Sequence, residues 1–206
     1  MKCRTPIKSY SCNRGIMTSI ASEKRKLRSR YLNLRRQMGR RLREEYSEQI
    51  LGHLAGWKPF RDARTVHCFM TIDKNGEVDT GPILQKLVRD GKRVVIPKSE
   101  EKTRELRHYL YRGDEQLEKN KWGIPEPVDG EEVGADELDL VLVPMIAADR
   151  QKHRLGYGLG FYDRFLSQTP ALKAGLLFEV FLQRDPLPVE EFDVRLDYLV
   201  TEKGIY

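Results

Sequence analysis

The chain of 206 residues contains little cysteine and little histidine, three and four residues respectively. Cys3, Cys12 and Cys68 are odd in number and form no CxxC pair, which argues against a disulfide scaffold and a thiolate zinc site. Long apolar runs are also missing, because the longest, at 140–148, contains a proline and is far shorter than the roughly 20 residues that span a bilayer. No apolar stretch follows the first cations, so we expect no secretory signal, no membrane partner and a cytoplasmic setting.

What the chain does have is enough apolar sequence for one core. Hydrophobic residues make up 39% and aromatic residues 9%, against 33% charged residues, a balance that argues against a mainly disordered chain. The length supports one good core and is too short for two large domains. We expect residues 1–20 to be a disordered lead-in, residues 21–206 to form a single domain, and the protein to be a monomer.

The net charge of +6 is concentrated in one segment. Residues 1–50 hold 14 Lys and Arg against 4 Glu, whereas the rest of the chain holds 23 basic and 27 acidic residues. Such a segment is most often the solvated face of a helix, but it could bind nucleic acid or reach a small ligand that carries phosphate. Few aromatic residues, among them Tyr31 and Tyr46, interleave with the cations, and no nucleic-acid-binding motif is present. We therefore expect no nucleic-acid partner, and the other two alternatives stay open.

The hydrophobic pattern predicts an α/β fold. Apolar residues recur every three or four positions from Leu27 to Ile50, which predicts a basic amphipathic segment that begins after Ser22 and divides into two helices at Gly39. Further helices are expected from Pro82 to Gly91 and over 161–167. Strands are expected at 65–70, 93–96, 108–111, 140–143, 174–178 and 198–201, with mostly loop over 113–136. This order predicts a single three-layer α/β/α domain with a mostly parallel sheet and N-terminal basic helices.

The most informative segment, 142–166, leads from an apolar strand through the alternating glycines GYGLG into a helix. Such glycines let backbone N–H groups gather around an anion, and ligands of open α/β sheets lie beyond the carboxyl ends of the strands. Arg154 offers a cationic fork for phosphate oxygens, and Asp163 a carboxylate for Mg²⁺. The segment matches neither GxGxxG nor GK[ST]. From spacing alone, a phosphate site and a purely structural turn stay equally open.

Together with four other segments, the run LVPMIAADRQKHRLGYGLGFYD resembles a known family, the 5-formyltetrahydrofolate cyclo-ligases or methenyltetrahydrofolate synthetases. The other segments occur in the family's order and are EKRKLR at 23–28, FMTIDKNGEVDT at 69–80, WGIPEP at 122–127 and FDVRLDYLVTEKGI at 192–205. The resemblance covers nearly the whole chain from residue 22 to residue 205. The departures from the family pattern remove no charged residue and are Met145, Ile146, Ala148, His153, Leu159 and Phe161.

The resemblance implies an ATP- and Mg²⁺-dependent enzyme that cyclises 5-formyltetrahydrofolate to 5,10-methenyltetrahydrofolate and releases ADP and phosphate. The formyl oxygen would attack the γ-phosphate, and the second folate nitrogen would close the ring of the resulting iminium phosphate. Phosphoryl transfer needs mainly positioning and neutralisation of charge. The alternatives are a divergent relative that binds nucleotide or folate without turnover and, with less support, a nucleic-acid-binding module on the basic helix.

The same resemblance gives each site residue an expected role. The catalytic residues would be Lys24 and Arg154. ATP would be bound by Lys24, Arg25, Arg28, Arg154, Gly156, Gly158, Gly160 and Tyr162. Folate would contact Met70, Glu77, Tyr157 and Phe161, and Mg²⁺ would be held by Asp163 and Asp193. For each residue the structural alternative is a solvated charge, a tight turn or a packed core side chain.

Overall fold

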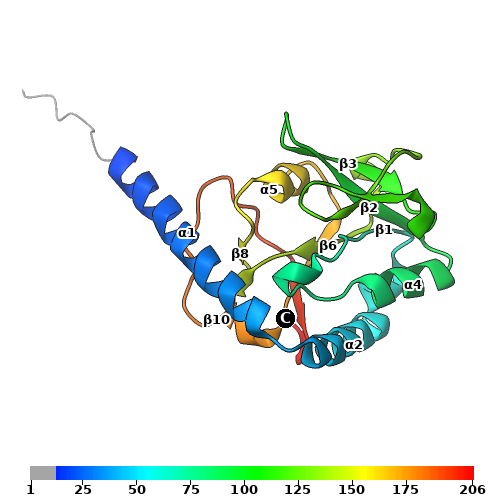
Figure 1. Cartoon of the computed structure of the whole chain (residues 1–206), viewed down its shortest axis with the longest axis horizontal. Coiled ribbons are helices and arrows are strands. Elements are labelled where there is room, and N and C mark those ends of the chain that lie inside the picture. The colour runs from blue at the N-terminus through cyan, green and yellow to red at the C-terminus, as the bar shows by residue number, and fades with distance from the viewer. Residues whose placement is uncertain (1–12) are drawn as a thin grey trace, which may run out of the picture.

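The computed structural model describes residues 13–206 of the chain, with side chains from residue 20 onward (Figure 1). Its helices are α1 (Asn13–Gln37), α2 (Arg40–Gly56), α3 (Lys58–Asp62), α4 (Gly81–Arg89) and α5 (Phe161–Leu166). Among the residues so described, no helix has the length and apolar character that crossing a membrane requires. Single 3-10 turns are η1 (Asp73–Asn75), η2 (Asp114–Gln116), η3 (Ala135–Glu137) and η4 (Glu179–Phe181).

Helix α1 begins at Asn13, ahead of the N-cap expected at Ser22. Residues 13–20, which we expected to belong to a disordered lead-in, are therefore helical, and residues 1–12 of that segment lie outside the described residues. The expected division of the basic segment is confirmed, because α1 ends at Gln37 and Gly39 is the N-cap of α2.

A seven-stranded sheet forms the centre of the molecule, in the order β12-β11-β9-β6-β1-β2-β3. Its strands are β1 (Thr65–His67), β2 (Arg93–Glu100), β3 (Glu105–Leu110), β6 (Leu140–Pro144), β9 (Leu172–Leu176), β11 (Tyr198–Thr201) and β12 (Gly204–Ile205). The five strands from β11 to β2 run parallel, and an antiparallel strand closes each edge. The expected mostly parallel sheet is thus confirmed.

Helices cover both faces of this sheet, which confirms the three-layer architecture. In Figure 1, α2 and α4 lie on one side of the sheet and α5 lies on the other. Strand β6 at the centre is buried along Leu140–Val143, as expected for a parallel strand covered on both faces. The core is one contiguous cluster that also takes residues from α2, α4 and α5.

Several short elements were not expected from the sequence. Strand β1 ends at His67 rather than at residue 70, and the segment 113–136, expected to be mostly loop, contains the hairpin of β4 (Leu117–Lys119) and β5 (Pro125–Pro127). A second small sheet joins β10 (Leu182–Gln183), β7 (Ala147–Asp149) and β8 (Arg154–Leu155). Strands of two or three residues carry no readable alternation of polar and apolar side chains, which explains why they were missed.

The buried face of α1 also differs from the expected one. Leu34 is 45% exposed, whereas Lys24, Tyr31 and Arg35 are buried. Spaced four or three positions apart, the residues 24, 28, 31 and 35 form one stripe of the helix, and three of the four are cations. A cation on this stripe stays buried because it meets carboxylates or carbonyl oxygens, and hydrophobicity alone cannot predict that.

Strand order places a crevice between β1 and β6. From β1 the chain passes through α4 to β2 on one side, and from β6 it passes to β9 and β11 on the other. The carboxyl ends of β1 and β6 therefore border the point at which the winding direction reverses. In open α/β sheets this point is where ligands bind.

Candidate functional site

A cavity of about 400 Å³ opens at this reversal point. The segment after β1 contributes Phe69, Met70 and Ile72, the glycine-rich turn before α5 contributes residues 156–160, and the β4–β5 segment contributes Trp122, Ile124 and Glu126. The remaining lining residues are Leu32, Arg36, Lys74, Asn75, Glu77, Pro97, Ser99, Leu106, Pro144, Arg154, Phe161, Tyr162 and Asp163. The volume and the largely apolar walls suit a flat organic molecule with a few polar groups.

The glycine-rich turn takes a backbone shape that only glycine adopts easily. Gly158 has φ +93° and Gly160 has φ +75°, both in the left-handed region. Gly160 is also the N-cap of α5, so the turn leads directly into the helix as expected. The guanidinium of Arg28 lies against Gly158, where an added Cβ would be 3.0 Å from Arg28 Cζ. Because Gly158 has no side chain, the turn can lie this close to Arg28 of helix α1.

Arg154 fixes the chain on both sides of this turn. Its buried guanidinium donates from Nη1 to the carbonyl of Val194 at 2.6 Å and from Nη2 to the carboxylate of Asp163. The N–H of Val194 donates to the same carboxylate at 3.3 Å. Strand β8, helix α5 and the segment before β11 therefore meet at one ion pair, which positions Asp163 at the edge of the cavity.

Lys24 joins α1 to the segment 190–193. Its buried Nζ lies 2.8 Å from Glu190 Oε2 and also donates to Asp193 Oδ2. The Asp193 carboxylate accepts the N–H of Glu190 at 2.7 Å, which holds the segment in a turn. One helical turn after Lys24, Arg28 Nε donates to the carbonyl of Gly156 at 2.8 Å. Burial lowers the pKa of Arg28, while the charges of Glu190, Asp193 and then Asp163 raise it. Cations and carboxylates are therefore gathered around the glycine-rich turn.

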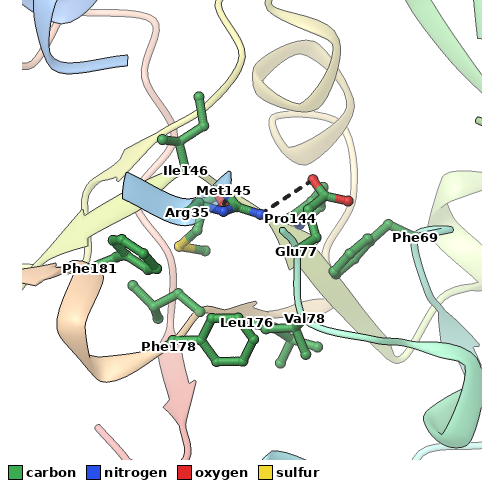
Figure 2. Close-up of a pocket in the computed structure, with 11 residues that line it drawn as sticks. Arg35, Phe69, Glu77, Val78, Pro144, Met145, Ile146, Leu176, Phe178 and Phe181 are labelled. Atoms are coloured by element: carbon green, nitrogen blue, oxygen red, sulfur yellow. Dashed lines mark hydrogen bonds and ion pairs between the residues drawn. The ribbon is translucent and has the colours of Figure 1, made fainter. Parts of the chain in front are cut away.

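Glu77 is a buried carboxylate in the wall of the same cavity. Its Oε2 accepts the N–H of Ile72 at 2.7 Å, and its Oε1 accepts the hydroxyl of Tyr157. Arg35 Nη2 lies behind it, 3.9 Å from Oε1 (Figure 2). Burial raises the pKa of Glu77, and the charge of Arg35 followed by the two hydrogen bonds opposes this rise. Burial and the neighbouring Glu77 charge raise the pKa of the Tyr157 phenol.

The structure brings most of the expected site residues together. Ten of them line the cavity, namely Met70, Glu77, Arg154, Gly156, Tyr157, Gly158, Gly160, Phe161, Tyr162 and Asp163. Lys24, Arg28 and Asp193 lie outside the lining. Arg28 contacts it through the carbonyl of Gly156, whereas Lys24 and Asp193 pair with each other next to Val194, whose N–H donates to Asp163. Arg25 does not: its side chain is exposed on α1 and is not part of the lining.

Sequence reasoning missed several residues of this site. The clearest is Arg35, four positions after Tyr31 on the inward stripe of α1. Trp122 belongs to the WGIPEP motif but has no predicted role, and it lines the cavity together with Glu126. Glu126 is held by the N–H of Ser99 at 3.0 Å. Membership of a recognised motif was the available signal for Trp122, whereas Arg35 offered only its spacing from Tyr31 and Arg28.

The carboxylates of the site fit one kind of magnesium binding. Within residues 13–206, no three His, Cys, Asp or Glu side chains are grouped so that they could hold a metal ion by themselves. Asp163 and Asp193 instead pair with Arg154 and Lys24, and the charges of both carboxylates act on Arg28. Mg²⁺ at phosphate sites needs only one or two carboxylates, with phosphate oxygens and water as the other ligands. These residues fit an ion that arrives with a phosphate ligand, and do not fit a closed protein cage.

Comparison with known proteins agrees with the motifs. A family model described as the 5-formyltetrahydrofolate cyclo-ligase family matches residues 20–202. The 5-formyltetrahydrofolate cyclo-ligase of Escherichia coli K12 is 33% identical over 169 residues, covering 79% of this chain and 91% of that protein. The cyclo-ligase of Saccharomyces cerevisiae is 33% identical over 166 residues, covering 69% and 78% respectively.

A solved structure has the same fold. The NMR structure of Aquifex aeolicus 5,10-methenyltetrahydrofolate synthetase aligns with a TM-score of 0.78 at 31% identity, covering 88% of this chain and 91% of that one. The methenyltetrahydrofolate synthetase of Mycoplasma pneumoniae aligns with a TM-score of 0.71 at 21% identity, a level that supports the fold alone.

Proposed function

This chain belongs to the 5-formyltetrahydrofolate cyclo-ligase family and is a ligase of that family, and we propose that it closes 5-formyltetrahydrofolate to 5,10-methenyltetrahydrofolate at the expense of ATP. The site has two halves, the cationic region around the glycine-rich turn and the cavity wall that contains Glu77. The observation that carries the proposal is that one segment, 154–163, contributes to both halves. Tyr157 reaches the buried carboxylate in the cavity, and Gly158 lies against the guanidinium of Arg28 from α1. Arg154, at the start of the segment, pairs with Asp163 at its end. Such a turn can hold two substrates against each other.

The proposed reaction begins with phosphoryl transfer. A lone pair of the formyl oxygen attacks the γ-phosphorus, and the bond from that phosphorus to the bridging oxygen breaks with its electrons passing to ADP. The second folate nitrogen then attacks the formyl carbon and loses its proton, and the carbon–oxygen bond breaks to release phosphate. Phosphorylation is needed because an amide oxygen is otherwise a poor leaving group. Positioning of the reactants and neutralisation of charge are the main contributions of a protein to such transfer.

We assign the cationic half to ATP. Lys24, Arg28 and Arg154 lie around the glycine-rich turn, whose N–H groups and cations match a triphosphate. Arg154 borders the cavity and is the residue placed to neutralise charge that develops during transfer. Lys24 acts from the outer side, where it would exchange contacts with Glu190 and Asp193 for a phosphate. The exposed Arg25 keeps only the role of a nearby positive charge.

We assign the half lined by Glu77 to the folate. A pterin ring is flat and carries several N–H donors, which a buried carboxylate can accept in pairs. Met70, Tyr157, Phe161 and Tyr162 offer apolar and aromatic surface in the same cavity. The residues that depart from the family pattern at 145, 146 and 148 are buried and do not line this cavity. They therefore give no reason to expect a lost substrate site.

We propose that Asp163 and Asp193 hold Mg²⁺ together with the phosphates of ATP. The ion would neutralise phosphate charge and fix the geometry of the γ-phosphate. Within the protein, Asp163 is positioned by Arg154 and by the N–H of Val194, and Asp193 by Lys24. The expectations of a monomer, of a cytoplasmic setting and of no nucleic-acid partner rest on the sequence and stay predictions.

The test is turnover of the purified protein with 5-formyltetrahydrofolate, ATP and Mg²⁺, followed by the absorbance of the methenyl product. ATP and Mg²⁺ are each omitted in control reactions. Arg154→Met should lower kcat by at least about 100-fold, because a charge that stabilises the transition state is removed. Arg150→Met is the matched control, because Arg150 lies in the same hairpin and is exposed. Its guanidinium lies 3.8 Å from the Glu179 carboxylate, and it does not line the cavity.

The outcomes separate the alternatives. Product that grows only with ATP and Mg²⁺ supports the proposed reaction. No product from folded protein that still binds ATP and folate would favour a relative that binds without turnover. No binding of either substrate would contradict the proposal altogether.

A further inference from the structure

Arg35 is a buried cation that the proposed reaction does not use directly. It is 3% exposed in the last turns of α1, and its Nη1 donates to the carbonyl of Met145 at 2.6 Å. Its Nε donates to the carbonyl of Gly76 at 3.2 Å, and its Nη2 lies 3.9 Å from Glu77 Oε1. One guanidinium thus ties α1 to the segment after β6 and to the turn that carries Glu77. Burying a guanidinium is costly, so an isolated one requires compensating partners.

The position of Arg35 is behind Glu77 and outside the substrate cavity. Glu77 lines the large cavity, whereas Arg35 does not. Arg35 instead borders a second cavity of about 10 Å³, which Glu77 also lines (Figure 2). Apart from Arg35 and Glu77, every side chain that lines this small cavity is uncharged and apolar, including Phe69, Leu176 and Phe178. In such surroundings the field of a single cation is weakly screened.

Glu77 needs a counter-charge to stay ionised. Its carboxylate is buried, and the charged or titratable groups near it are Arg35 from α1, Tyr157 from the glycine-rich turn, Tyr162 from α5 and Asp73 from η1. Tyr157 and the N–H of Ile72 donate hydrogen bonds, whereas Asp73 carries the same charge as Glu77. Arg35 is therefore the cation that favours the charged form of Glu77. A protonated Glu77 would carry a hydrogen on one oxygen, so only the other oxygen could accept an N–H donor of the pterin ring freely.

We propose, on the basis of the proposed function, that Arg35 is a positioning residue that keeps Glu77 ionised and directed into the large cavity, where the carboxylate accepts the N–H donors of the pterin. The two carbonyl contacts of Arg35 fix the guanidinium, and the guanidinium fixes the carboxylate. Arg35 acts on folate affinity through Glu77 and has no part in ATP binding, because its hydrogen bonds and ion pair in the described part of the chain join it to Gly76, Met145 and Glu77.

The first experiment compares Arg35→Met with the wild-type enzyme from pH 6 to pH 9. We expect the KM for 5-formyltetrahydrofolate to rise by about tenfold or more at pH 7, since a charge-assisted contact is lost, with the KM for ATP changed less than about twofold. The increase should shrink as pH rises, because a Glu77 without its counter-charge ionises only at higher pH. Arg35→Lys should lie between the two, with a pH profile close to that of the wild type.

The control and the second variant address folding. Arg30→Met removes an exposed cation of the same helix, whose guanidinium lies 5.6 Å from the ring centroid of Tyr31, and should leave both KM values unchanged. Glu77→Gln and the double variant Arg35→Met/Glu77→Gln complete a thermodynamic cycle. If Arg35 acts through Glu77, the double variant loses no more folate affinity than Glu77→Gln alone. It should also melt higher than Arg35→Met, because no unpaired carboxylate is buried.

Three results would overturn the inference. They are a folate KM of Arg35→Met equal to that of Arg30→Met, a loss that is independent of pH, or additive losses in the double variant. If Arg35→Met does not fold, the Arg35→Lys profile and the double variant decide by the same criteria. Wild-type enzyme that neither binds nor turns over 5-formyltetrahydrofolate would contradict the proposed function itself, and the role of Arg35 with it.

Discussion

The charged side chains of this site form pairs of opposite charge. Arg154 pairs with Asp163, Lys24 with Asp193, and Arg35 with Glu77. In each pair at least one member is buried. Where the remaining charge is buried, as for Arg154, Lys24, Arg35 and Glu77, removing its partner typically costs about 3–5 kcal/mol of stability. For substitutions at these positions, the melting temperature of the variant must therefore be measured as well as its reaction rate.

Asp163→Asn tests the metal assignment with little structural change. An amide oxygen can still accept from Arg154 and from the N–H of Val194, whereas the negative charge is lost. We expect kcat to fall by about 100-fold, the Mg²⁺ concentration for half-maximal rate to rise, and folate binding to persist. Asp197→Asn is the control, because Asp197 is exposed and accepts the N–H of Lys173 at 2.8 Å. An unchanged Mg²⁺ requirement in Asp163→Asn would remove Asp163 from the metal site.

Lys24→Met should weaken ATP binding and stability together. The substitution leaves Asp193 and Glu190 without their common cation and removes a positive charge beside the glycine-rich turn. We expect the KM for ATP to rise by about tenfold or more and the melting temperature to fall by several degrees. Lys26→Met, at an exposed position two residues along α1, should change neither. Equal KM values for ATP in the two variants would show that Lys24 is structural only.

At the scale of elements, the glycine-rich turn is the part that tolerates least change. Gly158→Ala forces a side chain into a backbone with φ +93° and places its Cβ 3.0 Å from Arg28 Cζ. We expect the KM for ATP to rise by about tenfold, because Arg28 or the turn must move, with a small loss of stability.

The control for the turn is Gly52→Ala. Gly52 lies inside α2, and an added Cβ there meets nothing within 4 Å. Alanine in a helix interior is favoured over glycine by roughly 1 kcal/mol, so this variant should melt higher than wild type with unchanged kinetics. A Gly158→Ala enzyme with wild-type KM for ATP would contradict the assignment of this turn to the triphosphate.

Elements marked by a glycine, by a long apolar run or by regularly spaced apolar residues could be predicted from the sequence, whereas elements held in place by polar contacts could not. The break between α1 and α2, strand β6 and helix α5 follow from glycine, from a continuous apolar run and from a capping turn. The inward stripe of α1 was predicted wrongly at Leu34, because the cations at 24 and 35 are buried by partners that come from distant segments. Partners as far as 169 positions away leave no local signal.

At the scale of the whole molecule, a pair of buried histidines links stability to pH. His67 on β1 and His108 on β3 have ring centroids 5.1 Å apart, and Phe165 of α5 packs on both. Burial lowers the pKa of His67 well below its usual value, and the charge of His108 lowers it further. Burial lowers the pKa of His108 to about 4, with Glu132 opposing the change.

The unfolded chain binds protons at these histidines below pH 6.5, whereas the folded protein does not until much lower pH. Stability is therefore complete above about pH 6.5 and is lost as pH falls from there toward about 4, by up to about 3 kcal/mol for His108. Melting curves between pH 7.5 and pH 4.5 should show this fall. His108→Gln should flatten it, and a slope that the substitution leaves unchanged would assign the acid sensitivity to other groups.

The mostly parallel sheet and the family could be predicted for the molecule as a whole. The sheet follows from the alternation of expected strands and helices, and the family from five motifs that occur in one order along the chain. What the motifs did not show is how the site is closed. Trp122 and Glu126 reach the cavity from the β4–β5 hairpin, in a segment that was expected to be mostly loop. Arg35 reaches Glu77 from α1, whose cations gave no sign in the sequence of being buried. Both depend on contacts between segments far apart in the sequence.

The ion pair between Lys24 and Asp193 joins a helix near the beginning of the chain to a segment near its end. During synthesis on the ribosome, Lys24 emerges long before the two carboxylates that neutralise it, so these ion pairs cannot form until almost the entire polypeptide has been made. A chain that stops short of residue 190 would carry Lys24 and still lack Glu190 and Asp193, its carboxylate partners. Under the proposed assignment of Lys24 to ATP, full activity would therefore report on completed translation as well as on correct folding.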